Sequence, residues 1–221
     1  MWLQPGMAMV LDMDGVIVDS NPLHVQVWTA YNRRFGIDGG ASLAERMYGR
    51  RNDEIVRDFF GAHLSAKEIA AHGSAKEALY REMLEPVFAE TLVPGVEALL
   101  CRHAGAPVAL ATNAEPANVD FVLEHGRLRA YFRAVVDGHQ VSRPKPHPEI
   151  YLRAAELLSI APRNCIVFED SYQGMQAAQA AGTRIVGVRT THTELPGADL
   201  AIDNFLSPAL EPWLRAQMPE G

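Results

Sequence analysis

Short apolar segments alternate with amphipathic segments along most of the chain, and this alternation limits the possible fold more than any other feature of the sequence. Six apolar runs end in turn or acidic residues and are predicted to be strands: MAMVLD, PVALATN, RAVVDG, CIVFED, RIVGV and ADLAID. Helical patterns lie between them: PGVEALLCRHAG, PANVDFVLEHG, PEIYLRAAELL and YQGMQAAQAAG. Strand followed by helix, several times over, predicts a doubly wound α/β fold, in which helices cover both faces of a parallel sheet.

Residues 21 to 92 interrupt this alternation. The segments NPLHVQVWTAYNRRFG, NDEIVRDFF and LSAKEIAAHGSAKEALYREMLE show only helical periodicity. We therefore predict an α/β core formed by residues 1–20 and 93–221, with a small helical domain, residues 21–92, inserted after the first strand.

Composition narrows the class of partner. The chain has 221 residues, of which 48% are apolar, which is enough for one sizeable core and a smaller unit. Its net charge of −7, without a run of Lys and Arg, argues against nucleic acid or an anionic membrane and favours a small ligand. No basic leader and no run of 18 uncharged apolar residues is present. We expect a cytoplasmic monomer.

The two cysteines fit the same expectation. Cys101 lies in a predicted helix and Cys165 opens a predicted strand. Two unpaired thiols packed in the core, in a reducing compartment, are expected rather than a disulfide or a metal site.

The first strand ends in acids. In MVLDMDGVIVDS, Asp12 and Asp14 follow a run of buried-type residues, and an unpaired ionised carboxylate there would cost several kcal/mol, roughly as much as the whole folding margin. Side chains two apart in a strand point to the same face, so the two carboxylates converge on one point. A cation is therefore expected beside them.

Other polar side chains follow the remaining predicted strands. Ligands of open α/β sheets bind outside the carboxyl ends of the strands, near the point where strand order reverses. The residues expected to share one crevice with the two aspartates are Thr112 and Asn113 after VALA, Lys145 in SRPKPHP, and Glu169 and Asp170 at the end of IVFED.

These residue types suit phosphoryl transfer. Either Asp12 or Asp14 can attack phosphorus as a nucleophile, and the other can carry protons to the leaving group and from water. Asp170, together with Glu169, would complete a Mg²⁺ site that neutralises the phosphoryl oxygens. Lys145 would add a fixed positive charge.

Each fragment alone also has an ordinary structural explanation. An Asp-x-Asp pair occurs by chance, ATN is a common helix cap, PKPHP is a common turn, and FED can be a solvated strand end. Their occurrence together, in this order, favours a single site.

The ordered set resembles the haloacid dehalogenase superfamily of Mg²⁺-dependent phosphohydrolases, in the branch of β-phosphoglucomutase-like and sugar-phosphate phosphatases. DMDGVIVDS resembles the first motif of that family, LATN the second, the lysine of RPKP the third and FEDSYQGMQAA the fourth. The resemblance implies an α/β core with a mobile helical cap that closes over the substrate and excludes water.

Residue roles follow from the resemblance. It implies that Asp12 is the nucleophile and Asp14 the general acid/base. It further implies that Asp12, the Asp14 carbonyl and Asp170 hold Mg²⁺ with help from Glu169. The phosphate-binding residues it implies are Gly15, Thr112, Asn113 and Lys145.

Five residues of the predicted cap are candidates for substrate contact. His24 and Trp28 share one face of a helix directly after the first motif, as in the mutase-like branch. Arg50 or Arg51 in GRRNDE would hold a phosphate or sugar, and Lys76 matches a lysine position of the mutase cap. Core packing or solvated surface positions are the alternatives for these residues.

Two departures from the mutase pattern bear on the reaction. The chain has GRRN and AEP where mutases have G-x-S-R and an S-K-N-like run, so Glu115 places an anion where a mutase has a cation. This favours hydrolysis of a small sugar phosphate or similar phosphorylated metabolite, with a β-phosphoglucomutase as the alternative. A dehalogenase would need neither Mg²⁺ nor Asp14, and a catalytically silent binding protein would not need all four motifs.

Overall fold

The computed structural model describes residues 3–38, 43–47 and 50–220, and the chain divides into two compact units. One unit, here called the α/β unit, comprises Met1–Asp19 and Thr91–Gly221. The other, the helical unit, comprises Ser20–Glu90. Gly49, which opens the GRRN segment, lies outside the described residues.

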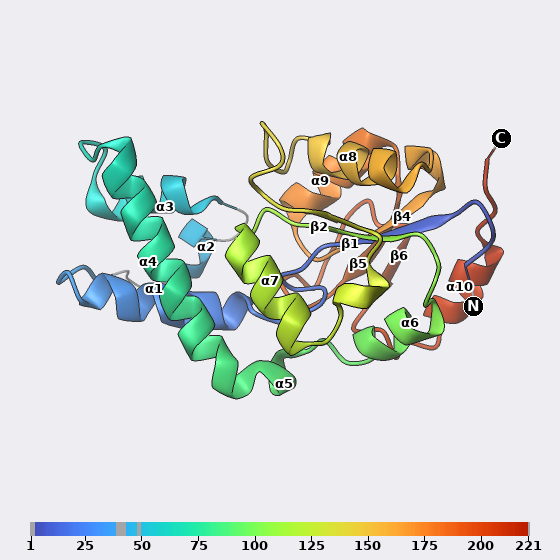
Figure 1. Cartoon of the computed structure of the whole chain (residues 1–221), viewed down its shortest axis with the longest axis horizontal. Coiled ribbons are helices and arrows are strands. Elements are labelled where there is room, and N and C mark those ends of the chain that lie inside the picture. The colour runs from blue at the N-terminus through green and yellow to red at the C-terminus, as the bar shows by residue number, and fades with distance from the viewer. Residues whose placement is uncertain (1–2, 39–42, 48–49, 221) are drawn as a thin grey trace. The chain divides into compact units, whose positions relative to one another are not determined.

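The α/β unit is built on a six-stranded sheet with the order β3-β2-β1-β4-β5-β6, in which every neighbouring pair is parallel (Figure 1). All six predicted strands are confirmed, with these bounds: β1 Ala8–Leu11, β2 Val108–Ala111, β3 Ala134–Val136, β4 Cys165–Glu169, β5 Arg184–Val188 and β6 Leu200–Ile202. The strands are short and almost wholly buried, which agrees with their continuous apolar runs.

Helices cover both faces of this sheet. Their bounds are α6 Val96–Arg102, α7 Pro116–His125, α8 Glu149–Leu158, α9 Tyr172–Ala181 and α10 Leu210–Ala216, with short 3₁₀ turns η2 Arg129–Tyr131 and η3 Pro162–Asn164. Figure 1 shows α8 and α9 on one side of the sheet and α6 and α7 on the other. This is the arrangement that right-handed crossovers produce when the chain winds from β1 to β3 and then from β4 to β6.

Small side chains let α8 and α9 pack closely on the sheet. Ala154 and Ala155 of α8 and Ala177 and Ala178 of α9 are buried in one cluster with the apolar side chains of the strands. Burying a Val, Leu or Ile side chain stabilises a fold by roughly 1.5–3 kcal/mol, so this layer contributes a large part of the stability of the α/β unit.

The cysteine prediction is half correct. Both thiols are free, and Cys165 is buried in β4 as expected. Cys101 is exposed on α6, so its expected place in the core is wrong. It lies on the polar face of α6, whose buried face is formed by Val96, Leu99 and Leu100.

The helical unit contains α1 Asn21–Arg33, α2 Leu43–Met47, α3 Asn52–Phe60, α4 Ala66–Leu84 and the 3₁₀ turn η1 Glu85–Val87, and α5 Phe88–Thr91 ends at its boundary. Ser65 starts α4 with a capping box, since its hydroxyl accepts from the Glu68 amide while the Glu68 carboxylate accepts from the Ser65 amide. Trp28 and Tyr80 are buried between α1, α3 and α4. Among the described residues, no helix of either unit is long and apolar enough to cross a membrane.

Candidate active site

Three buried carboxylates meet where the strand order reverses. The chain winds away from β1 in one direction and from β4 in the other, and ligands of such folds bind at this point. Leu11 of β1 is paired with Phe168 of β4, so Asp12 follows β1 directly beside Glu169. The Asp12 amide donates to the Phe168 carbonyl at 3.1 Å. Oxygens of Asp12, Glu169 and Asp170 all lie within 4.8 Å of one another.

Lys145 joins two of these acids. Its Nζ lies 2.9 Å from Asp12 Oδ1 and 2.6 Å from Glu169 Oε1, and only 6% of the lysine is exposed. Its backbone amide donates to Asn113 Oδ1 at 3.3 Å, which ties the loop before α8 to the loop after β2. Lys145, from the third motif, thus connects residues from the other three motifs.

Glu169 is held by several donors besides Lys145. Tyr151 of α8, fully buried, donates its hydroxyl to Glu169 Oε1 at 2.6 Å. The other oxygen, Oε2, accepts from the Asp170 amide at 3.0 Å and from the Ser171 amide and hydroxyl at 3.1 and 3.0 Å. A Cβ on Gly174 would overlap this carboxylate, so α9 can approach it only with glycine there. These contacts fix Glu169 in one orientation.

Asp170 packs against the loop that follows β1. Thr191 donates its hydroxyl to Asp170 Oδ2. Gly15 has a φ of +77° and a Cβ there would overlap the Asp170 carboxylate, so both backbone conformation and space require glycine. The neighbouring Thr190 donates to the Gly15 carbonyl at 2.5 Å.

The pKa values of the three carboxyl groups are shifted in different directions. Burial raises the pKa of Asp12 to about 7, even though Lys145 acts in the opposite direction. Burial, with the nearby charges of Glu169 and Asp12, also raises the pKa of Asp170 well above its usual range. Burial alone would raise the pKa of Glu169 too, but the charge and hydrogen bond of Lys145 outweigh it and lower that pKa.

The donor set fits a divalent cation. When all three carboxylates are ionised, the one ammonium group of Lys145 leaves two negative charges, which one divalent cation would balance. Carboxylate oxygens are the ligands that hard cations such as Mg²⁺ and Ca²⁺ prefer. Asp12, Asp170 and Glu169 could therefore hold such an ion.

The remaining predicted core residues lie at the same edge of the sheet. Thr112 is buried directly after β2, and its Oγ1 accepts from the Ala114 amide at 3.1 Å. Asp14 forms a single backbone bridge with Val18, and its charge acts on Asp12. The site thus contains Asp14, Gly15, Thr112 and Asn113 in addition to the charged cluster.

In the helical unit, Lys76 is buried in a polar cluster. Its Nζ lies 2.8 Å from Glu77 Oε1 and 2.8 Å from His24 Nδ1, and 5.4 Å from the centre of the Trp28 ring. Since an ammonium group only donates, His24 Nδ1 accepts and the ring proton of neutral His24 is on Nε2. His24 stacks on Tyr80 with ring centres 4.1 Å apart. His24, Trp28 and Lys76 therefore form one cluster, and Glu77 matches the charge of the lysine.

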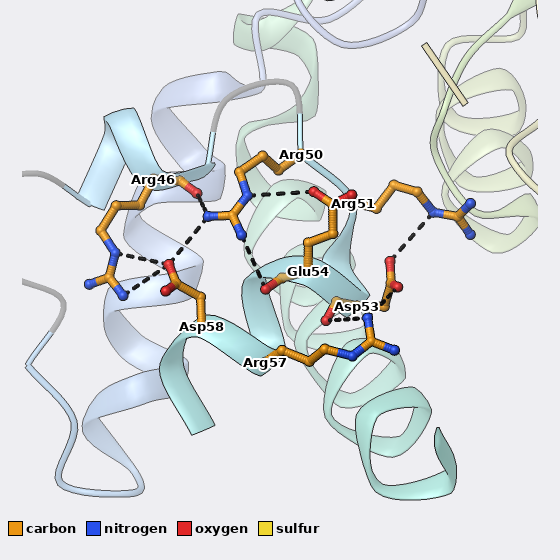
Figure 2. A network of polar contacts seen from close by, with 7 residues as sticks. All are labelled: Arg46, Arg50, Arg51, Asp53, Glu54, Arg57 and Asp58. Carbon is orange, nitrogen blue, oxygen red and sulfur yellow. Dashed lines mark hydrogen bonds and ion pairs between the residues drawn. The ribbon is translucent and has the colours of Figure 1, made fainter. Parts of the chain in front are cut away.

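Arg50 lies in a network of ion pairs that Figure 2 shows. Its Nη1 donates to Asp58 Oδ2 at 3.2 Å and to the Arg46 carbonyl at 3.0 Å, and its Nε lies 3.5 Å from Glu54 Oε2. Arg46 also pairs with Asp58, at 3.0 Å. The acids of α3 thus hold Arg50 within the helical unit.

Arg51 precedes α3 and also has an acidic neighbour. Its Nε lies 3.5 Å from Asp53 Oδ1, while Arg57 pairs with the other oxygen of Asp53 at 2.7 Å (Figure 2). Arg51 and Asp53 have side chains more than 40% exposed, and such pairs contribute about 0–1 kcal/mol. The pairing of Arg51 is therefore easily exchanged for another anion.

Sequence reasoning missed four residues of these clusters. Tyr151 is one apolar-face residue among several in YLRAAELL, and nothing in the pattern separates it from the core. Glu77 follows Lys76 in a helix full of charges. Thr190 and Thr191 left a usable signal, since they follow β5, the strand next to β4, at its carboxyl end.

Comparison with known proteins identifies the family. The family model described as haloacid dehalogenase-like hydrolase matches residues 7–182. The chain belongs to this family. The resemblance stated from the four motifs is therefore confirmed, as is the doubly wound fold with a helical insertion.

The relatives with named activities include phosphatases and a mutase. The chain is 34% identical to the phosphorylated carbohydrates phosphatase of Thermotoga maritima, over 82% of this chain and 84% of the relative. It is 30% identical to the fructose-1-phosphate phosphatase YqaB of Escherichia coli, over 82% of this chain and 95% of the relative. A solved structure, the β-phosphoglucomutase of Clostridium difficile, superposes with a TM-score of 0.82 at 26% identity, covering 95% of this chain and 96% of that one.

Proposed function

We propose that this protein is a Mg²⁺-dependent phosphatase that hydrolyses a small sugar phosphate or similar metabolite through an aspartyl-phosphate on Asp12. The observation that supports it most directly is the buried cluster of Asp12, Lys145, Glu169 and Asp170 at the switch point of the sheet. A phosphoryl group needs a nucleophile and positive charge together, and this cluster can provide both.

The side chains then have distinct roles. The Asp12 carboxylate attacks phosphorus while the bond from phosphorus to the leaving oxygen breaks, and Asp14 gives that oxygen a proton. Asp14 next takes a proton from water, whose oxygen attacks the aspartyl-phosphate, so that inorganic phosphate leaves and Asp12 is restored. Lys145 favours the ionised form of Asp12 and binds phosphoryl oxygens, with Thr112 and Asn113 as further donors. The Gly15 amide donates instead to the Val18 carbonyl at 2.7 Å.

Asp12, the Asp14 carbonyl and Asp170 would hold Mg²⁺, which would supply positive charge to the phosphoryl oxygens and favour the ionised form of Asp12. Glu169 would act mainly through Lys145 and through the hydrogen bonds that orient it. The raised pKa values of Asp12 and Asp170 support this role, because a bound cation would relieve the repulsion among the carboxylates.

Hydrolysis is preferred over the mutase reaction for two reasons. A mutase must hold a second phosphate, and Arg50 and Lys76 both have acidic partners within the helical unit. Glu115, just before α7, adds an anion after the second motif. A β-phosphoglucomutase remains the second candidate, because a structure of that enzyme is similar along nearly the whole chain.

The proposal also gives the helical insertion a role in the reaction. Residues 21–92 act as a mobile cap that contributes His24, Trp28, Arg51 and Lys76 to substrate selection and excludes water during the reaction. The enzyme works as a cytoplasmic monomer. Gel filtration at micromolar concentration tests its oligomeric state.

The first experiment uses p-nitrophenyl phosphate with Mg²⁺ and with excess chelator, followed by a screen of phosphorylated metabolites. We expect turnover that requires Mg²⁺ and highest kcat/KM for a sugar monophosphate. Full activity in excess chelator would contradict the metal site, and no turnover of any ester would contradict the function and favour a silent binding protein.

A second experiment separates phosphatase from mutase. The enzyme receives β-glucose 1-phosphate with a trace of the 1,6-bisphosphate, and both glucose 6-phosphate and released phosphate are measured. We expect phosphate to accumulate. If glucose 6-phosphate forms many times faster, the enzyme is a mutase, and Arg51→Ala should then reduce isomerisation far more than hydrolysis.

A further inference from the structure

Three consecutive side chains after β5 connect three different parts of the site. Thr190 donates to the carbonyl of Gly15, in the loop after β1, at 2.5 Å. Thr191 donates to Asp170 Oδ2, after β4. His192 stacks on Tyr172, the first residue of α9, with ring centres 4.0 Å apart and an angle of 15°. We call Thr190–His192 the β5 strap.

We infer that the β5 strap sets the position of Asp170 as a metal ligand, with Thr191 as the positioning residue. This inference rests on the proposed function only in assigning a Mg²⁺ site to Asp170. None of the four sequence motifs contains the strap.

The geometry explains why such a strap is needed. Glu169 has Tyr151, Lys145, two backbone amides and Ser171 around it, all from its own loop or from α8 and the loop before it. Asp170 accepts a hydrogen bond from the Thr191 hydroxyl, in the segment that follows β5, a different strand. A carboxylate bonded on one oxygen cannot rotate freely, and partners of this kind typically change metal affinity 10- to 100-fold when removed.

The anchor at Gly15 couples two ligand-bearing loops. Gly15 leaves room for the Asp170 carboxylate, and Thr190 holds the Gly15 carbonyl while its neighbour Thr191 holds Asp170. A shift of the strap would therefore move the loop after Asp12 and the carboxylate of Asp170 together. The stacked pair of His192 and Tyr172 fixes the far end of the strap on α9.

The test measures Mg²⁺ binding by isothermal titration calorimetry on the full chain, without substrate, and Mg²⁺ activation of p-nitrophenyl phosphate hydrolysis. Thr191→Val removes the hydroxyl and keeps the branched shape. We expect its Kd for Mg²⁺ to rise at least about tenfold, with kcat at saturating Mg²⁺ within about threefold of the unmodified enzyme. Thr191→Ser keeps the donor and should restore the Kd to within about twofold.

A matched control removes a comparable hydroxyl elsewhere. Thr183 donates to the Ala178 carbonyl at 3.0 Å after α9, so Thr183→Val should leave Kd and kcat unchanged. His192→Ala leaves both threonine hydroxyls in place and should raise the Kd two- to fivefold. It provides a second test if Thr191→Val does not fold.

Several results would overturn the inference. An unchanged Mg²⁺ Kd in Thr191→Val or, should that variant not fold, in His192→Ala would do so, as would an equal rise in Thr183→Val. Absence of Mg²⁺ binding by the unmodified protein would also refute it. If that protein binds Mg²⁺ but hydrolyses no phosphate ester, the proposed function fails while the comparison of Kd values still decides the role of Thr191.

Discussion

Replacing Tyr151 by Phe removes one hydrogen bond of the site, from a neutral hydroxyl to a carboxylate, and leaves the other contacts in place. The hydroxyl of Tyr151 is fully buried and donates to Glu169 Oε1 at 2.6 Å, and Glu169 is itself fully buried. A hydrogen bond to a charged group contributes about 1.5–3 kcal/mol, more than a neutral one. Because Lys145 and the donors on Oε2 stay in place, the carboxylate keeps its other partners and the loss should stay within this range.

The assay is urea and thermal unfolding of the α/β unit at pH 7.5, in chelator so that metal binding does not contribute. A loss of about 1.5–3 kcal/mol corresponds to a Tm decrease of roughly 3–12 °C for a unit of this size. Tyr172→Phe is the matched control, since that side chain is 45% exposed and its ring stays on His192, and it should change stability by less than about 0.5 kcal/mol. If Tyr151→Phe is equally mild, the hydroxyl does not stabilise Glu169 and the reasoning fails.

Further predictions concern catalysis, metal and pH. Asp12→Asn should reduce kcat by well over tenfold without loss of secondary structure. A reduction of less than about tenfold, which corresponds to about 1.4 kcal/mol of barrier, would argue against Asp12 as the nucleophile. Asp14→Asn should still form phosphoenzyme from an activated aryl phosphate and then stall, which acid-quenched labelling detects. Asp170→Ala should weaken Mg²⁺ activation, and Ca²⁺ should inhibit the unmodified enzyme because it accepts more ligands at longer distances. Burial raises the pKa of Glu77, but Lys76 outweighs it and lowers that pKa to about 2, so this carboxylate stabilises the folded helical unit above pH 4.5 and loses that effect as pH falls toward 2. The free energy of unfolding in urea should therefore fall less between pH 5 and pH 3 in Glu77→Gln than in the unmodified protein.

The fold could be predicted because the local apolar pattern of each segment agrees with the strand or helix that the segment forms. The six apolar runs are six strands of one parallel sheet, as predicted, whereas the order of the strands was not predicted and comes from the structure. Helix α10 had no prediction. Its sequence, LEPWLRA, is short and contains an internal Pro, so its pattern alone is too weak, and buried Leu210 and Leu214 hold it.

The charged part of the site could also be predicted, for a reason of energy. A buried carboxylate needs a partner, so Asp12, Glu169 and Asp170 at strand ends indicate a cation, and Lys145 was a candidate on the same ground. The positions of Arg50, Arg51 and Lys76 could not be predicted in this way. Their acidic partners lie 1–8 residues away on helices, where charges are common whether or not they form a site.

Neutral hydrogen-bond donors cannot be found from the cost of burying a charge, and two such donors of this site, Tyr151 and Thr191, lie outside the family motifs. Tyr151 has a hydroxyl that costs little to bury when bonded, so it does not disturb the apolar periodicity of its helix, and Thr191 is a neutral residue of the loop after β5 whose position alone is informative. Yet each fixes a carboxylate whose orientation determines how well a cation is held. Two chains with identical acids and lysine can therefore differ in metal affinity through residues outside the motifs. Under the proposed function, the motifs would supply the acids and the lysine of the site, while Tyr151 and the β5 strap would determine how firmly Glu169 and Asp170 are held in place.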